Sequence, residues 1–365
     1  MGKTDSILED LRNLIVRGGL SPKSRLPTQR ELVDRYRAGP MTIQNVFSRL
    51  ARDGFIESKG NLGTFVAGNP PHLCDYGLVF ISRQGVSDWR RFYTVLLNEA
   101  STINDGRARK MHFYHNIAGH TDSHAQQDRL LADMCAHKLA GVIFTTDPPA
   151  EMIHRVPWQS LPVPIVAIMS KPGIPGVPVV TLHDESFMAR ALDYLVSRGR
   201  RRVAFLDNMR PTLAAFEARQ NYLLATIADK GMTCQSHWRL TAGALAAVGV
   251  RNIIQLLFEP GRSNRPDALF VTDDNFVEYA TAGLMAAGVR VPEDVDVVAH
   301  CNFPWPAPNA MPIKRLGYDA REVLRQCMNV IDMQRQGQTP PKQVLVEAVF
   351  EEAVAAAVSV QHMAS

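Results

Sequence analysis

The feature that most constrains the fold is an alternation of short apolar segments with helical stretches. The strand candidates are residues 76–82, 110–115, 141–145, 163–169, 202–207, 267–272 and 295–300, with QVLVEAVF near the end. The helix candidates are 88–104, 122–138, 184–198, 212–230, 275–287 and 318–335. Near-continuous apolar strands that alternate with helices predict parallel sheets covered by helices. Because about 290 residues is large for one sheet, we expect an α/β body with two lobes.

The first 66 residues have a different pattern. Ile7, Leu8, Leu11, Leu14 and Ile15 repeat at helical spacing, and Gly18-Gly19 ends that helix. Thr28, with Glu31 three residues later, is a capping box for a second helix that runs to about Tyr36.

Pro40 opens a third helix, because proline suits the first turn and Gly39 can cap it. Its apolar residues Ile43, Val46, Phe47 and Leu50 form one face. Residues 55–58 and 63–66 then flank a turn and predict a hairpin. The order of helix, helix, turn, helix and hairpin predicts a winged helix-turn-helix.

Charge and composition agree with a DNA-binding head on a neutral body. Residues 1–66 hold 11 Lys and Arg against 7 Asp and Glu, and the remaining residues hold 29 of each, so the whole net charge of +4 lies in the head. The chain is 46% hydrophobic and 21% charged, which is typical of a soluble globular protein. The domains are expected at 1–67 (head), 68–75 (a linker with two prolines) and 76–365 (body).

The head resembles the GntR family of bacterial regulators. The segments that carry the resemblance are LPTQRELVDRY (26–36), GPMTIQNVF (39–47), LARDGFI (50–56) and GTFV (63–66). The body resembles the two-lobed, periplasmic-binding-protein-like sensor domain of the LacI/GalR repressors over about residues 76–352. The matching segments include 195–208, 215–225 and 266–299. Heads and sensors of these two kinds occur together in arabinose-responsive repressors.

The third helix is the expected recognition helix, whose side chains reach the base edges of the major groove. The expected DNA contacts are Thr28, Gln29, Arg30, Met41, Thr42, Gln44, Asn45, Arg49, Lys59, Asn61 and Thr64. Pro40 and Gln44 stand where the family usually has arginines that read guanine. Because amide side chains suit adenine, we expect A·T pairs at those operator positions.

The resemblance also implies an effector site between the lobes. Arg219 matches the effector-binding arginine of the LacI/GalR family, and Asp274 matches its ligand-binding aspartate. Further candidates are Ser82, Trp89, Asn208 and Trp305. The family's G-F-D after the sixth strand reads Ala299-His300-Cys301 here, so one expected carboxylate is lost.

The sequence therefore predicts a cytoplasmic transcriptional regulator, and a repressor is the preferred interpretation. We expect a homodimer that binds double-stranded operator DNA and a sugar or related metabolite, without membrane attachment. No catalytic residue, metal or cofactor is expected, because common phosphate-binding, hydrolase and metalloprotease motifs do not occur. The five cysteines have no metal-site spacing. Two alternatives stay open: a regulator with a vestigial pocket that binds DNA constitutively, and a sugar-processing enzyme.

Overall fold

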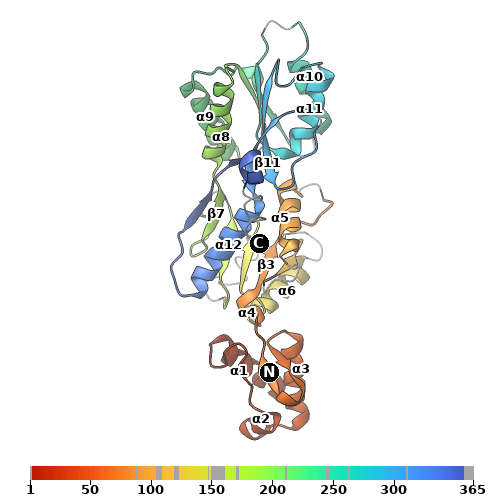
Figure 1. Cartoon of the computed structure of the whole chain (residues 1–365), viewed down its shortest axis with the longest axis vertical. Coiled ribbons are helices and arrows are strands. Elements are labelled where there is room, and N and C mark those ends of the chain that lie inside the picture. The colour runs from red at the N-terminus through yellow and green to blue at the C-terminus, as the bar shows by residue number, and fades with distance from the viewer. Residues whose placement is uncertain are drawn as a thin grey trace. The chain divides into compact units, whose positions relative to one another are not determined.

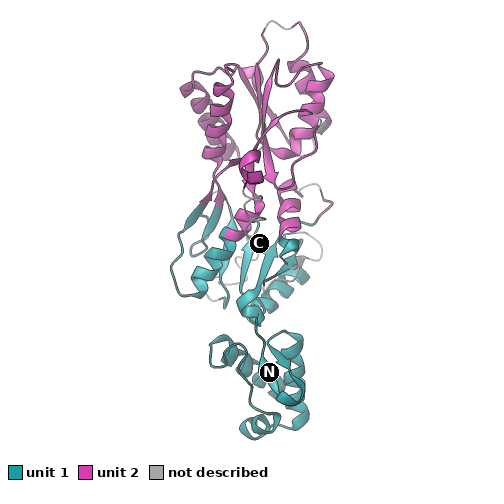
Figure 2. Ribbon diagram, in the orientation of Figure 1, with its two compact units in different colours: residues 1–83, 100–180, 326–344 teal, residues 84–99, 181–325, 345–365 magenta. Residues whose placement is uncertain are grey.

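The computed structural model describes residues 2–86, 89–103, 109–118, 123–146, 148, 161–169, 172–209, 212–243, 247–261, 264–309 and 311–356. Contacts divide the chain into two compact units, coloured separately in Figure 2. Unit 1 comprises residues 1–83, 100–180 and 326–344, and unit 2 comprises residues 84–99, 181–325 and 345–365. Among the described residues, no helix is both long and apolar enough to cross a membrane.

The head in unit 1 is a winged helix-turn-helix, as predicted. Its elements are α1 (Lys3–Val16), α2 (Gln29–Tyr36), α3 (Pro40–Arg52), β1 (Ile56–Ser58) and β2 (Thr64–Val66). The capping box of α2 forms, with the Glu31 amide donating to the Thr28 hydroxyl at 3.3 Å. The strands pair antiparallel, with Ile56 opposite Val66. Ile43, Val46 and Leu50 are fully buried, so the apolar face of α3 builds the head's core.

The rest of unit 1 is a lobe around a six-stranded sheet, labelled in part in Figure 1. Its strand order is β13 (Gln343–Val346), β7 (Val179–Leu182), β6 (Ile165–Ile168), β5 (Gly141–Phe144), β3 (Asp75–Val79), β4 (Lys110–Tyr114). The β3, β4, β5, β6 and β7 pairings are parallel. The helices are α4 (Pro71–Cys74), α6 (Ser123–Cys135) and most of α12 (Ala320–Arg335).

Unit 2 contains the second six-stranded sheet. Its strand order is β14 (Val349–Phe350), β12 (Lys314–Asp319), β11 (Asp296–Phe303), β10 (Ala268–Val271), β8 (Val203–Asn208), β9 (Arg239–Ala242). All these pairings are parallel except that of β12 with β14. The helices are α8 (Asp184–Ser197), α9 (Leu213–Asp229), α10 (Ala247–Leu257), α11 (Val277–Ala286) and most of α5 (Arg91–Thr102). Figure 1 shows α8 and α9 on one face of the sheet and α10 and α11 on the other.

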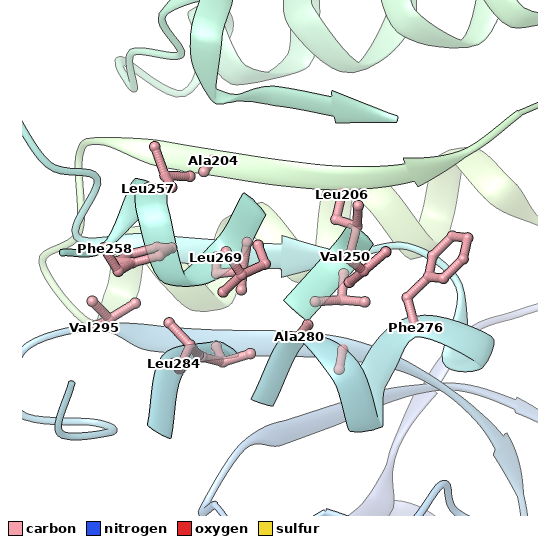
Figure 3. Close-up of a cluster of buried hydrophobic side chains, with 14 of the residues drawn as sticks. Ala204, Leu206, Val250, Leu257, Phe258, Leu269, Phe276, Ala280, Leu284 and Val295 are labelled. Carbon is pink, nitrogen blue, oxygen red and sulfur yellow. The ribbon is translucent and has the colours of Figure 1, made fainter. Parts of the chain in front are cut away.

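The core between the unit 2 sheet and helices α10 and α11 is tightly packed. Leu206, Leu269 and Val295 of the sheet side pack with Val250 and Leu284 of the two helices (Figure 3). The helices approach so closely that a Cβ on Gly283 would lie 2.6 Å from the Arg251 carbonyl oxygen. Glycine is therefore required at this helix crossing.

The predicted α/β class with two parallel sheets is confirmed, and five of the helices and strands described above were missed. Strands β7, β9 and β12 and helices α4 and α10 had no counterpart in the sequence prediction, which treated residues 68–75, where α4 lies, as a linker. β7 follows a proline-rich segment, β9 is a largely exposed edge strand, and β12 begins with two basic residues. The segment QVLVEAVF forms two strands, β13 and β14, which join different sheets.

Candidate DNA interface and effector site

The exposed face of α3 carries the side chains expected to read DNA. Met41, Gln44 and Asn45 are all exposed, and Met41 is 73% accessible. Thr42 lies half-buried on the flank of the helix. A groove of about 370 Å³ runs between α3 and the wing, and Gln44, Gln29 and the two threonines Thr28 and Thr64 are among the residues that line it.

Other residues predicted to contact DNA already have partners within the head. The Gln29 amide donates to the Pro40 carbonyl at 2.9 Å and so ties α2 to the start of α3. Arg49 pairs with Asp5 at 2.7 Å. Asp5 is partly exposed, and its hydrogen bond from Arg49 lowers its pKa. Arg30 is exposed on α2, so it is accessible to a phosphate or a base.

The wing presents further polar groups. Lys59 pairs with Glu57 at 2.9 Å and lies 5.2 Å from the Phe65 ring centroid. Asn61 is exposed at the tip of the wing. Arg25, which the sequence analysis missed, is exposed beside Gly63 and lines the same groove as Gln44. Arg25 directly precedes Leu26-Pro27, where the segment that resembles the GntR family begins, and this position could have indicated it as a candidate.

In unit 2, polar side chains gather where β8, β10 and β11 end. Because these strands are parallel, their carboxyl ends meet at one edge of the sheet, where ligands of open α/β sheets bind. Asn208 at the end of β8 donates to Asp273 after β10 at 2.7 Å. Asp274 is 4% exposed and accepts a hydrogen bond from Asn302 of β11 at 2.8 Å.

Asp274 also has a cation beside it. Arg91 Nε lies 3.6 Å from Asp274 Oδ2, and its Nη2 donates to the Trp305 and Pro306 carbonyls at 3.2 and 2.8 Å. His300 Nδ1 lies 3.9 Å from the other carboxylate oxygen. Arg91 was not among the predicted residues, because a surface arginine at a helix start carries no recognisable motif.

Arg219 lies in a buried ion pair rather than at an open surface. Its Nε donates to both oxygens of Asp207 at 3.2 Å, and it also contacts Asp184. Thr272 and Gln220 hydrogen-bond to the same Asp207 carboxylate, which is fully buried. Burial lowers the pKa of Arg219 to about 10, so the guanidinium stays charged at neutral pH.

The remaining effector candidates are dispersed. Trp305 is 47% exposed, and its indole N–H donates to Glu99 at 2.6 Å. Trp89 donates to the Thr94 hydroxyl at 2.8 Å. Ser82 belongs to unit 1, where it is buried after β3. Unit 2 thus joins Asn208 to Asp273, and it joins Asp274 to Arg91, which also donates to the Trp305 carbonyl. Arg219 belongs to a separate network around Asp207.

Two family models match separate parts of the chain. Residues 3–66 match the bacterial regulatory proteins of the gntR family, and residues 192–350 match the periplasmic binding protein-like domain. The chain joins a GntR-family head to a periplasmic-binding-protein-like body. This architecture is that of a ligand-modulated DNA-binding regulator.

Individual relatives match all or part of the chain. The chain is 19% identical over 344 residues to the arabinose metabolism transcriptional repressor of Geobacillus stearothermophilus, covering 87% of this chain and 89% of that protein. A LacI-family regulatory protein from Chloroflexus aggregans superposes with a TM-score of 0.59 at 15% identity, over 76% of this chain and 96% of that one. A LacI-family regulator from Lactobacillus casei with bound glucose gives 0.55 at 18% identity, over 76% and 98%. These structures share the fold of the body.

Proposed function

We propose that this GntR-headed chain is a cytoplasmic transcriptional repressor. It binds a two-fold-related operator as a homodimer, and a sugar or related metabolite bound in the body changes its operator affinity. The observation that carries the proposal is the exposed polar face of α3 in a winged head that is joined to a body with a polar strand edge. The likeness to a repressor of arabinose metabolism supports both repression and a sugar effector.

The operator is expected to carry A·T pairs beneath the start of α3. Gln44 and Asn45 are exposed there, and amides bond adenine at N6 and N7. Selection of binding sites from random DNA by the full chain tests this. The proposal is supported if the wild type selects half-sites with A·T pairs. It is also supported if Gln44→Arg changes the selected pair to G·C at one position. A guanine-centred wild-type site contradicts it.

The surface of α10 and α11 supports a homodimer. Val248, Ile253 and Leu256 of α10 and Met285 of α11 are between 44% and 68% exposed. Large exposed apolar side chains that cluster on neighbouring helices mark interaction sites, and a two-fold operator requires two copies of the head.

Sedimentation equilibrium tests the assignment of this surface. Leu256→Glu is expected to yield monomers that bind the operator weakly. Leu213→Glu is the matched control, because Leu213 is 71% exposed on α9, away from the proposed surface. Dissociation by the control and not by Leu256→Glu would place the interface elsewhere.

For the effector, the strand-edge groups Asp274 and Asn302 suit the vicinal hydroxyls of a sugar. A carboxylate and an amide that bond to each other at 2.8 Å can rotate onto neighbouring hydroxyls, and charge-assisted hydrogen bonds are the strong ones. A thermal-shift panel of pentoses, hexoses, deoxy-sugars and uronic acids tests this. One class should raise the melting temperature, and Asp274→Asn should abolish that rise. Steady conversion of the sugar by the pure protein would favour an enzyme instead.

One observation favours the second candidate, a regulator with a vestigial pocket. The Asp274 carboxylate is already engaged by Arg91 and Asn302, so a ligand must displace protein groups to reach it. If no sugar shifts the melting temperature of the wild type or of Arg91→Ala, and operator binding persists, constitutive DNA binding is the better description. A shift in Arg91→Ala alone would identify Arg91 as the group that blocks the site.

A further inference from the structure

The carboxylate that ends the recognition helix is buried against two close cations, with the exposed Arg52 farther away at 3.9 Å. Asp53 caps α3, its side chain is 7% exposed, and its backbone N–H donates to the Arg49 carbonyl at 2.9 Å. Its carboxylate lies 3.2 Å from Arg12 Nη2 and 3.0 Å from Lys138 Nζ. A buried negative charge at the negative end of a helix is unfavourable unless cations neutralise it. The need to neutralise the Asp53 carboxylate therefore explains why two cations lie close to it.

These two cations come from different parts of unit 1. Arg12 belongs to α1 of the head, whereas Lys138 follows α6 of the lobe and precedes β5. The Lys138 backbone is fixed, because its N–H donates to the Asp133 carbonyl at 2.9 Å. His137, directly before it, has a positive φ of 52°, a conformation that non-glycine residues adopt at a cost. The lobe loop thus holds its lysine in place against the head.

A second contact lies beside the first. Phe55, two residues after Asp53, is fully buried, and its ring stacks on His72 at 5.9 Å between centroids and 8° between planes. His72 belongs to α4, which continues directly into β3. The α4 carbonyl of Leu73 accepts a hydrogen bond from Arg335 of α12 at 3.1 Å. The end of the recognition helix therefore contacts the lobe at two points.

A cleft separates the head and the lobe close to these points. It has a volume of about 180 Å³ and is lined by α1, Arg49 and the lobe residues Cys135 and His137. Because this part of the junction is open rather than packed, individual contacts carry more of the restraint. The Lys138–Asp53 ion pair is a charged contact that reaches from the lobe to the end of the recognition helix.

We propose that Lys138 is a positioning residue for DNA binding, which holds the recognition helix at a set orientation on the lobe through Asp53. Lys138 does not read bases in this arrangement. It limits the orientations of the head and so the half-site spacings that a dimer can bind. This inference rests on the proposed operator-binding homodimer.

The test measures full-length protein against operators whose half-site spacing changes by one base pair at a time. Lys138→Ala is expected to weaken binding to the preferred spacing by about two- to five-fold, the range of a partly exposed ion pair. It should also reduce discrimination between spacings and leave the preferred half-site bases unchanged. Lys138→Glu should have a larger effect, and Lys138→Arg should restore both affinity and spacing discrimination.

Lys342→Ala is the matched control. It removes one exposed lysine of the same unit that forms no ion pair with the described residues of the head, and it should leave spacing discrimination as in the wild type. Equal losses in Lys138→Ala and Lys342→Ala would show a general charge effect and overturn the inference, as would unchanged spacing discrimination in Lys138→Ala. A wild type that binds no operator would instead overturn the proposed function. Thermal unfolding of each variant separates misfolding from lost positioning.

Discussion

The head and the strand edge of unit 2 present their polar side chains in opposite ways. On α3, Gln44 and Asn45 are exposed, so they can bond base edges without first giving up protein partners. At the strand edge, Asp274 is 4% exposed and bonded to Asn302. The Arg219 and Asp207 pair is also buried. The proposed base-reading face of α3 is therefore preformed, whereas the proposed effector surface must exchange internal bonds for ligand bonds.

This difference has an energetic consequence. Replacing an exposed amide removes contacts only in the complex, so its effect appears in DNA affinity. Replacing a member of the buried network leaves a charge without its partner, so its effect appears in the stability of the free protein. Mutations on the exposed face of α3 should therefore change DNA affinity, whereas mutations in the buried network should change the free energy of unfolding.

The largest expected effect comes from the buried pair. Arg219→Met leaves the Asp207 carboxylate, which is fully buried, without its cation and should lower the free energy of unfolding by about 3–5 kcal/mol. Chemical denaturation checks this. The double variant Arg219→Met/Asp207→Asn removes the charge but keeps the acceptor for Thr272, and it should recover part of the loss. Additive losses would show that the two groups are not coupled.

The next effect concerns the recognition helix. Gln44→Ala should weaken the binding free energy for the operator by about 1–3 kcal/mol. It should also relax the selectivity for the base pair that Gln44 contacts. Its free energy of unfolding should stay close to that of the wild type, because the side chain is exposed. Binding titrations with single-base operator variants measure the first quantity. Ser48→Ala on the same exposed face is the control, and an equal loss of selectivity there would remove the special role of Gln44.

A third effect depends on pH at the junction of head and lobe. Burial, with smaller contributions from Arg335 and His137, lowers the pKa of His72 to about 4. Since the ordinary pKa is about 6.5, the unfolded chain takes up the proton first as the pH falls. Stability is therefore full above pH 6.5 and declines toward pH 4, by at most about 1.4 kcal/mol per pH unit.

His72→Phe keeps a ring against Phe55 and should make this decline shallower. Denaturation at a series of pH values measures it. The burial of His115 and His137 lowers their pKa values as well, so part of the decline should remain. An unchanged slope in the variant would show that His72 does not titrate in this way.

The smallest effect is expected at the wing. If Lys59 contacts a phosphate, Lys59→Ala should weaken binding about equally across DNA sequences. It should also reduce by about one the slope of the logarithm of the binding constant against the logarithm of the salt concentration. Because Lys59 pairs with Glu57 at 2.9 Å and both side chains are 44% exposed, the affinity loss should stay below about 1 kcal/mol. Titrations at several salt concentrations measure the slope. Lys342→Ala should leave it unchanged.

The sequence was informative where residue type alone decides the structure. The capping box at Thr28 and the apolar face around Ile43 and Leu50 predicted the head correctly, because they are local patterns. The apolar β3 and β10 were recognisable because both faces of each strand are buried. Edge strand β9 was missed, since its exposed residues lack that pattern.

The site was predictable only in part. Asp274 and Asn208 follow recognisable strands, so their place at the strand edge could be expected. That Arg91 would engage Asp274, or that Asp207 would engage Arg219, could not. Those pairs depend on side-chain geometry between elements far apart in the chain. Lys138 was missed for the same reason.

Genomic footprinting of the purified full-length protein, with and without each sugar of the panel, tests the central claim most directly. The account predicts protection of a site with two symmetry-related half-sites and A·T pairs beneath Gln44 and Asn45. It also predicts that one class of sugar changes the protection. Protection without sequence preference, or none at all, would contradict the account.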